Sequence, residues 1–217
     1  MSDRMTELDL VVGSMFTTRP EEDRELFDDE REWLSDIQDL LREEGVEVDL
    51  LSRPGVEIWE GGIERFMDLY QLRQIAAYLE LDRDIAPLLK DGPLSDGDPD
   101  PLLAAIWDGE QPTRFPHLIN HQADGGYYLP VDFAEPIWLE AEEEEPVEAD
   151  GDDEDAEDDE PFISFGSSVG LQRELAELAG MLQQAGVPSQ SAAARCLLVM
   201  RTAADQSVAN GLPIIVW

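Results

Sequence analysis

The hydrophobic residues of this chain recur with two periods. Spacings of three and four residues predict amphipathic helices, which occupy the ranges 21–44, 63–81, 102–107, 167–185 and 188–210. Alternating hydrophobic and polar residues predict strands, which occupy 46–50, 56–59, 127–133, 162–165 and 212–217. The range 8–16 fits either type. Together these elements predict an α+β fold: a mainly helical single domain with a small antiparallel or mixed sheet.

Glycine and proline mark the expected ends of these elements. Pro20 precedes three acidic residues, which is typical of the first turn of a helix, and Gly45 is expected to end that helix. Pro54-Gly55 is expected to turn the chain between two short strands, which would then form a hairpin. Gly61-Gly62 is expected to introduce the second long helix.

Charge divides the chain into three parts. The formal net charge is −37. Residues 1–139 hold 33 acidic and 11 basic residues, residues 140–160 hold 15 acidic residues and no basic one, and residues 161–217 hold three of each. We therefore expect 1–139 to be an acidic, helix-rich part of one domain and 140–160 to be a disordered acidic loop, because such a segment has little apolar surface to bury. Residues 161–217 are expected to complete the same domain as strand, helix, helix and strand.

This charge narrows the choice of partner. Phosphates of nucleic acids and anionic lipids would be repelled, so the sequence predicts no direct binding of nucleic acid or membrane, and a basic protein becomes the expected partner. We interpret the chain as a non-catalytic acidic interaction protein, for example an immunity protein or inhibitor of a bacterial toxin. The expected partner-binding residues lie in the loop and are Glu142, Glu143, Glu144, Glu145, Asp152, Asp153, Glu154 and Asp155. Glu30 and Asp36, in the first predicted helix, form a secondary group. Adaptation to a salty solvent would produce the same composition.

The remaining composition points to a cytoplasmic protein without cofactors. Cys196 is the only cysteine, so the chain can form no disulfide within itself. The first fifteen residues hold no apolar run of signal-peptide length, and no segment approaches the roughly 18 apolar residues of a membrane span. The oligomeric state is left open.

A hydrolase is the alternative function. Gly166-Ser-Ser-Val-Gly170 satisfies the G-x-S-x-G pattern between an expected strand and an expected helix, which is the setting of a nucleophilic serine and would make Ser168 the nucleophile. In that fold the acid and the histidine follow the serine along the chain, whereas His117 and His121 precede it here. A capped helix start explains the same residues without catalysis.

The two histidines suggest a metal site as a second route to hydrolysis. His117 and His121 are four residues apart, so on a helix they would share one face and could hold an ion together with Asp124. Pro116 and the Gly125-Gly126 turn leave room for barely one helical turn. Histidines near a turn more often donate hydrogen bonds to backbone carbonyls.

One combination of motifs resembles a known set of sequences. His117 and His121 precede Gly126-Tyr-Tyr-Leu-Pro-Val-Asp-Phe133, and Gly166-Ser-Ser follows before a leucine-rich helix. In pairing these features the chain resembles a family of uncharacterised bacterial proteins. The resemblance covers about the last half of the chain, apart from the acidic segment, and implies no known activity.

Overall fold

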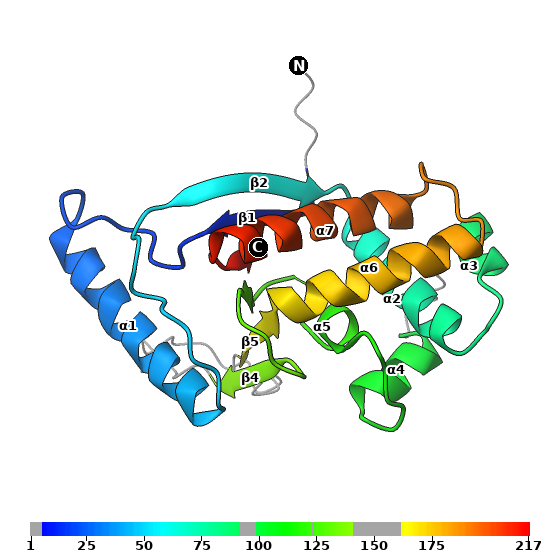
Figure 1. The fold of residues 1–217 in the computed structure, drawn as a ribbon, viewed down its shortest axis with the longest axis horizontal. Helices are drawn as coiled ribbons and strands as arrows, with labels where there is room; N and C mark the ends of the chain where they lie inside the picture. Colours follow the sequence, from blue (N-terminus) through cyan, green and yellow to red (C-terminus); the bar gives the residue numbers. More distant parts are fainter. Residues whose placement is uncertain (1–5, 92–98, 123, 141–161) are drawn as a thin grey trace, which may run out of the picture.

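A mixed six-stranded sheet runs through the structure (Figure 1). The computed structural model describes residues 6–91, 99–122, 124–140 and 162–217. The strands are β1 (Leu8–Gly13), β2 (Glu57–Ile63), β3 (Tyr127–Leu129), β4 (Ile137–Glu140), β5 (Phe162–Ser167) and β6 (Ile214–Val216). Their order across the sheet is β2-β1-β6-β3-β5-β4, and only β3 and β5 run parallel.

Seven helices are present among the described residues. They are α1 (Arg24–Glu43), α2 (Phe66–Glu80), α3 (Ala86–Asp91), α4 (Pro101–Trp107), α5 (Pro116–Ile119), α6 (Ser168–Gln184) and α7 (Ala192–Asn210). The predicted α+β fold with one domain and a mixed sheet is confirmed. None of the described helices is both long and apolar enough to cross a bilayer.

The sheet separates two hydrophobic cores. On one face, Leu10 and Tyr128 pack with α2, α6 and α7 in the larger core. On the other face, Phe165 packs in a smaller core that also contains Leu34 and Leu41 of α1. Because successive residues of a strand point to opposite faces, the short strands in the middle of the sheet contribute to both cores. The helix α1 therefore lies apart from the other helices, at one end of the molecule (Figure 1).

The predicted hairpin of residues 46–50 and 56–59 is wrong. β2 pairs with β1 along its length instead. Residues 46–50 form no strand, although Val46 and Leu50 are buried in the smaller core, so their alternation reflects burial alone. Gly61 and Gly62 lie inside β2 and do not introduce a helix. Residues 8–16, which fit either a strand or a helix, contain the strand β1.

The predicted ends of α1 are close to the observed ones. Asp23 caps the helix, since its carboxylate accepts hydrogen bonds from the backbone N–H groups of Glu25 and Leu26 at 3.1 and 3.2 Å. Gly45 follows its last turn with a φ of 82°, a conformation that favours glycine. The helix begins three residues later than Pro20 suggests, because the cap and not the proline sets its start.

The acidic segment interrupts two paired strands. Glu140 at the end of β4 pairs with Phe162 at the start of β5, so the chain leaves and re-enters the sheet at neighbouring positions. Residues 142–145 and 152–155, which include the expected partner-binding acids, lie outside the described residues. Leu139 and Ile163, next to these two ends, pack against the smaller core.

Candidate functional site

The short helix α5 is held at both ends by buried polar side chains. Glu174 of α6 accepts hydrogen bonds from the backbone N–H groups of His117 and Leu118 at 3.0 and 2.9 Å. At the other end, Arg73 of α2 donates to the carbonyl oxygens of Leu118 and His121, both at 2.7 Å. Carboxyl oxygens at the start and a cation at the end of a helix satisfy the backbone N–H and carbonyl groups that have no partner within the helix. Both side chains are buried, and burial raises the pKa of Glu174 to about 8.

His117 fixes the start of α6. Its Nδ1 accepts a hydrogen bond from the backbone N–H of Ser167 at 3.1 Å. That nitrogen therefore carries no proton, and Nε2–H donates to the carbonyl of Phe133 at 2.9 Å. The ring also meets the edge of the Phe133 ring. Burial lowers the pKa of His117, which favours this neutral form.

His121 occupies a deeper position between three backbone segments. Its Nδ1 lies 2.8 Å from the carbonyl oxygen of Gln122. Its Nε2 lies 3.1 Å from the carbonyl oxygen of Tyr127 and 3.3 Å from the hydroxyl of Ser164. The ring stacks on Tyr128 at 3.9 Å between centroids. Burial lowers the pKa of His121 to about 4, so the ring is neutral at pH 7 and only one of its two nitrogens donates to a backbone carbonyl.

Ser168 faces the core. Its side chain is completely buried. Its hydroxyl lies 3.2 Å from the carbonyl oxygen of Tyr128 and 2.7 Å from the hydroxyl of Ser207. Ser167 caps α6, since its hydroxyl oxygen accepts from the N–H of Gly170 at 2.8 Å. The predicted strand-to-helix setting is present, but the partners of Ser168 are a carbonyl and a second serine, and no solvent reaches it.

The two glycines of the G-x-S-x-G match make room for aromatic rings. A Cβ atom on Gly166 would lie 2.5 Å from Cδ1 of Tyr128 and 2.9 Å from Cδ2 of His121. A Cβ atom on Gly170 would press on the ring of His117, 2.6 Å from Nε2. The pattern that suggested a nucleophile therefore has a packing explanation.

The Gly-Tyr-Tyr-Leu-Pro-Val-Asp-Phe segment interlocks with the same two regions. The Ser167 hydroxyl donates to the carbonyl of Val131 at 2.6 Å, and the Tyr128 hydroxyl donates to the carbonyl of His117 at 3.1 Å. Asp132 pairs with Arg173 of α6 through two contacts of 2.7 Å. Together, 117–121, 126–133 and 166–174 form one hydrogen-bonded unit, which we call the histidine lock.

The contacts within the histidine lock give the serine and histidine motifs a structural role. His121 lies outside α5, so the two histidines do not share a helical face, and the ring nitrogens of both face protein groups. Asp124 is exposed and lies near Gln122. Among the described residues, no three His, Cys, Asp or Glu side chains are grouped so that they could hold a metal ion. Cys196 is buried in the larger core, where burial raises its pKa.

Replacing Gly170 with alanine should destabilise the fold. We expect Gly170→Ala to lower the free energy of unfolding by about 2 kcal/mol, because the new methyl group overlaps the His117 ring. Gly180→Ala on the same helix is the control: a Cβ there meets no atom within 4 Å, and alanine should stabilise the helix by up to about 1 kcal/mol. Urea unfolding measures both, and equal effects would contradict the packing role of Gly170.

His121 should make the fold less stable in acid. The unfolded histidine titrates near pH 6.5, whereas the folded one has a pKa of about 4. As the pH falls from 7 to 5, the unfolded state therefore binds a proton that the folded state does not. We expect this group to remove about 2 kcal/mol from the free energy of unfolding over that range, while the pH remains above the pI of about 4.1.

The comparison of wild type with His121→Asn isolates this effect. The carboxyl of Glu174, whose pKa burial raises to about 8, produces the opposite trend, but it is present in both proteins. Urea unfolding at pH 7 and pH 5 should show a larger loss in wild type. An equal loss in both proteins would mean that His121 does not titrate as described.

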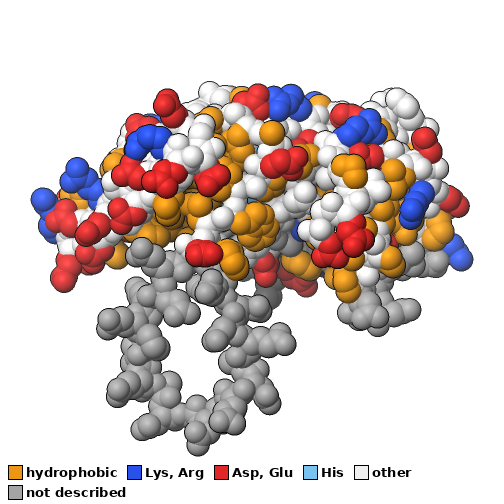
Figure 2. Space-filling model, turned by 90° about the horizontal axis from the view of Figure 1, so that it is seen from below, with side chains coloured by type: hydrophobic (Ala, Val, Ile, Leu, Met, Phe, Trp, Pro, Cys, Tyr) orange, Lys and Arg blue, Asp and Glu red, His pale blue; other side chains and the backbone are white. Residues whose placement is uncertain are grey.

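The second candidate site is a row of carboxylates on α1. Seven exposed acidic residues face away from the smaller core, and we call them the acidic ridge: Glu25, Asp28, Asp29, Glu32, Asp36, Asp39 and Glu43. Successive residues of a helix are about 100° apart, so all seven fall within an arc of about 100°. The buried residues Leu34, Ile37 and Leu41 lie on the opposite side. Figure 2 shows acidic side chains gathered at the left end of the molecule, where α1 lies.

The two α1 residues expected to bind a partner have different positions. Asp36 lies on the acidic ridge. Glu30 is only partly exposed and holds the preceding segment, since its carboxylate accepts from the Thr17 hydroxyl and from the backbone N–H of Thr18 at 2.9 Å. Glu30 therefore has a structural role. The other ridge residues were missed by the sequence reasoning, although a helical projection of residues 25–43 would have identified them.

Arginines lie along one flank of the acidic ridge. Arg24 pairs with Asp28 at 3.1 Å, and Arg42 pairs with Asp39. All four side chains are more than half exposed, and such surface ion pairs contribute about 0–1 kcal/mol. A basic partner could therefore replace these arginines at little cost.

Comparison with known proteins adds a family to this geometry. A family model described as "Putative DNA-mimic protein" matches residues 6–216. Searches of curated proteins and of solved structures found no match. The matched range includes α1, the sheet and the histidine lock, and leaves out only the first five residues and the last one. The chain therefore belongs to the family that this model describes.

Proposed function

We propose that this protein binds a basic, DNA-binding protein and occupies its DNA-binding surface with the acidic ridge of α1. Family membership supports an acidic protein that takes the place of DNA toward a basic partner. The target class includes nucleases, and an immunity protein for a nuclease toxin would be one case. We place this encounter in the cytoplasm, and no catalytic step is involved.

The spacing of the acidic ridge is the observation that carries this proposal. Its seven carboxylates extend from Glu25 to Glu43, which is about 27 Å at 1.5 Å per residue. The mean spacing along the ridge is thus about 4.5 Å per carboxylate. One strand of B-DNA presents one phosphate per about 3.4 Å along its axis. A protein groove that binds one DNA strand would meet a similar row of negative charges on α1.

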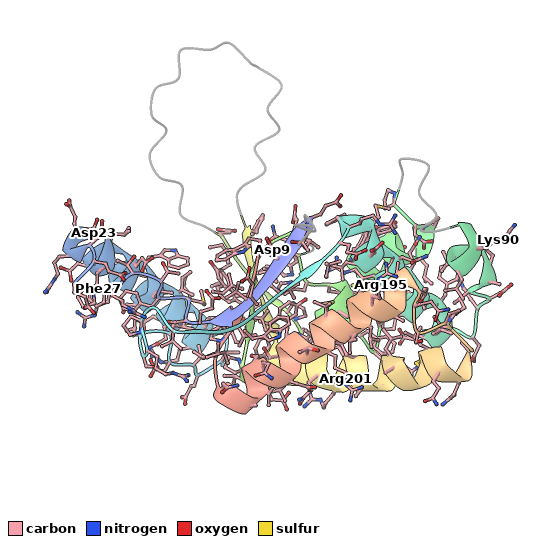
Figure 3. All side chains as sticks on the ribbon, turned by 90° about the horizontal axis from the view of Figure 1, so that it is seen from above. Asp9, Asp23, Phe27, Lys90, Arg195 and Arg201 are labelled. Carbon is pink, nitrogen blue, oxygen red and sulfur yellow. The ribbon has the colours of Figure 1, made fainter. Side chains whose placement is uncertain are left out.

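The position of α1 leaves the acidic ridge accessible. Asp23 and Phe27 mark the start of α1 at one end of the molecule, and Lys90 lies at the opposite end (Figure 3). The neutral part of the chain, residues 162–217, supplies α6 and α7 away from this end. The helix α1 carries eight acidic and three basic residues, and its exposed acids would steer a basic surface toward that end.

We propose the acids of residues 140–160 as a second contact. This segment adds 15 negative charges and no positive one. Its flanking residues Leu139 and Ile163 pack against the same small core as α1. The segment therefore begins and ends near the helix that carries the acidic ridge, and Glu142–Glu145 and Asp152–Asp155 could extend the charged surface.

Capture from a lysate of the source cell tests the proposal. The immobilised chain should retain a DNA-binding protein at low salt, and either high salt or added duplex DNA should release it. A chain lacking residues 141–160 should retain less of it. Capture only of proteins that duplex DNA fails to release would contradict the proposal.

A further inference from the structure

The helix α1 has a wider hydrophobic face than its core covers. Leu26, Trp33 and Leu40 remain 49%, 39% and 41% exposed. They are seven residues apart, and a heptad shifts a straight helix by only about 20°, so they form one line about 21 Å long. We call them the apolar stripe. It lies between the buried face of α1 and the acidic ridge.

We infer that the apolar stripe is the second half of the partner contact: it receives apolar side chains that lie beside the basic residues of the DNA-binding protein. This inference rests on the proposed function and adds the chemistry of the partner. The partner would present a row of arginine or lysine to the acidic ridge and a parallel row of leucine-like side chains to the stripe. Such a pair of rows is what one face of a basic amphipathic helix offers.

Charge selects this occupant over two others. A second copy of the chain would bring two acidic ridges close together, because each ridge borders its stripe, and like charges facing each other are unfavourable. Residues 140–160 of the same chain carry 15 acids and no base, so they would be repelled in the same way. A basic partner with apolar side chains satisfies both the ridge and the stripe.

An apolar contact would also help this protein to compete with DNA for the partner. Salt screens the attraction between exposed charges, with a Debye length of about 8 Å at physiological ionic strength. The burial of apolar surface is not screened in this way. The stripe would therefore add a contribution to the affinity for the partner that the phosphate backbone of DNA does not make. Tryptophan is common among the residues that dominate binding at protein interfaces, which makes Trp33 the expected centre of the contact.

Two synthetic peptides test the inference. Both are helical and carry the same arginines; one has leucine at every seventh position, and the other has glutamine there. We expect wild type to bind the leucine peptide roughly 100-fold more tightly at 0.5 M salt. Leu26→Ser/Trp33→Ser/Leu40→Ser should remove this preference without changing the salt dependence. Leu198→Ser on α7, where the leucine is 63% exposed, is the control and should keep the preference.

The outcomes separate this inference from the proposed function. Equal binding of the two peptides by wild type, with steep salt dependence, would overturn the stripe and leave the acidic ridge in place. Absence of binding at low salt would overturn both. A dimer that the triple serine variant abolishes would assign the stripe to a second copy. Deletion of residues 141–160 could also shift the tryptophan fluorescence to longer wavelength. If this shift occurs in wild type but not in Trp33→Phe, the stripe would be assigned to that segment.

Discussion

Neutralising four residues of the acidic ridge should weaken partner binding by roughly 10³-fold at low salt. The variant is Asp29→Asn/Glu32→Gln/Asp36→Asn/Glu43→Gln, which keeps the ion pairs of Arg24 and Arg42. Each charge facing an opposite charge at about 4 Å in water contributes about 1 kcal/mol, so four removed charges account for about 4 kcal/mol. Calorimetry with the captured partner measures the loss, which should shrink as salt rises.

A matched variant separates position from total charge. Asp82→Asn/Asp84→Asn/Asp108→Asn/Glu110→Gln also removes four exposed acids, next to α3 and α4 at the far side of the molecule from α1 (Figure 1). We expect it to lower the affinity by less than tenfold. If the two variants weaken binding equally, the net charge of the chain matters and the acidic ridge does not.

Replacing Arg73 should cause the largest loss of stability. Arg73→Met keeps the aliphatic bulk but removes the donors to the carbonyls of Leu118 and His121, which are buried. Unpaired buried acceptors cost about 1–3 kcal/mol each. We expect the free energy of unfolding to fall by about 3–5 kcal/mol, measured by urea unfolding.

Arg83→Met is the control for this substitution. Arg83 is exposed and lies over the ring of Tyr78 at 5.7 Å. Its replacement should change the free energy of unfolding by less than about 1 kcal/mol. If Arg73→Met is equally mild, α5 does not depend on its buried cation, and the account of the histidine lock fails at that end.

The sequence predicted the positions of the helices better than the pairing of the strands. The helices containing Leu34, Ile75 and Leu175 were identified from periodicity, because each has one face in a core. Pairing could not be obtained in the same way. Residues 46–50 alternate as a strand would, but β2 finds its partner in β1, almost fifty residues earlier in the chain. Local pattern does not encode such long-range choices.

The candidate sites were also not located from local sequence patterns alone. The serine and histidine motifs contain residue types that are common in catalytic sites, yet burial decides their role here. His121 and Ser168 are inside the protein, where they hold backbone segments together. The acidic ridge was hidden within a general excess of charge. A helical projection of the predicted helix would have placed these seven acids in one arc, whereas the prediction placed the main partner contact in the acidic segment.

The most direct test of the account is a competition for one surface. A fluorescently labelled DNA duplex bound to the captured partner is titrated with this protein, and fluorescence anisotropy is followed at a fixed, low salt concentration. The account predicts that anisotropy falls to the value of free DNA, and that the variant of Asp29, Glu32, Asp36 and Glu43 needs a roughly 10³-fold higher concentration to do so. Anisotropy that stays constant or rises, because DNA and this protein bind the partner together, would contradict it.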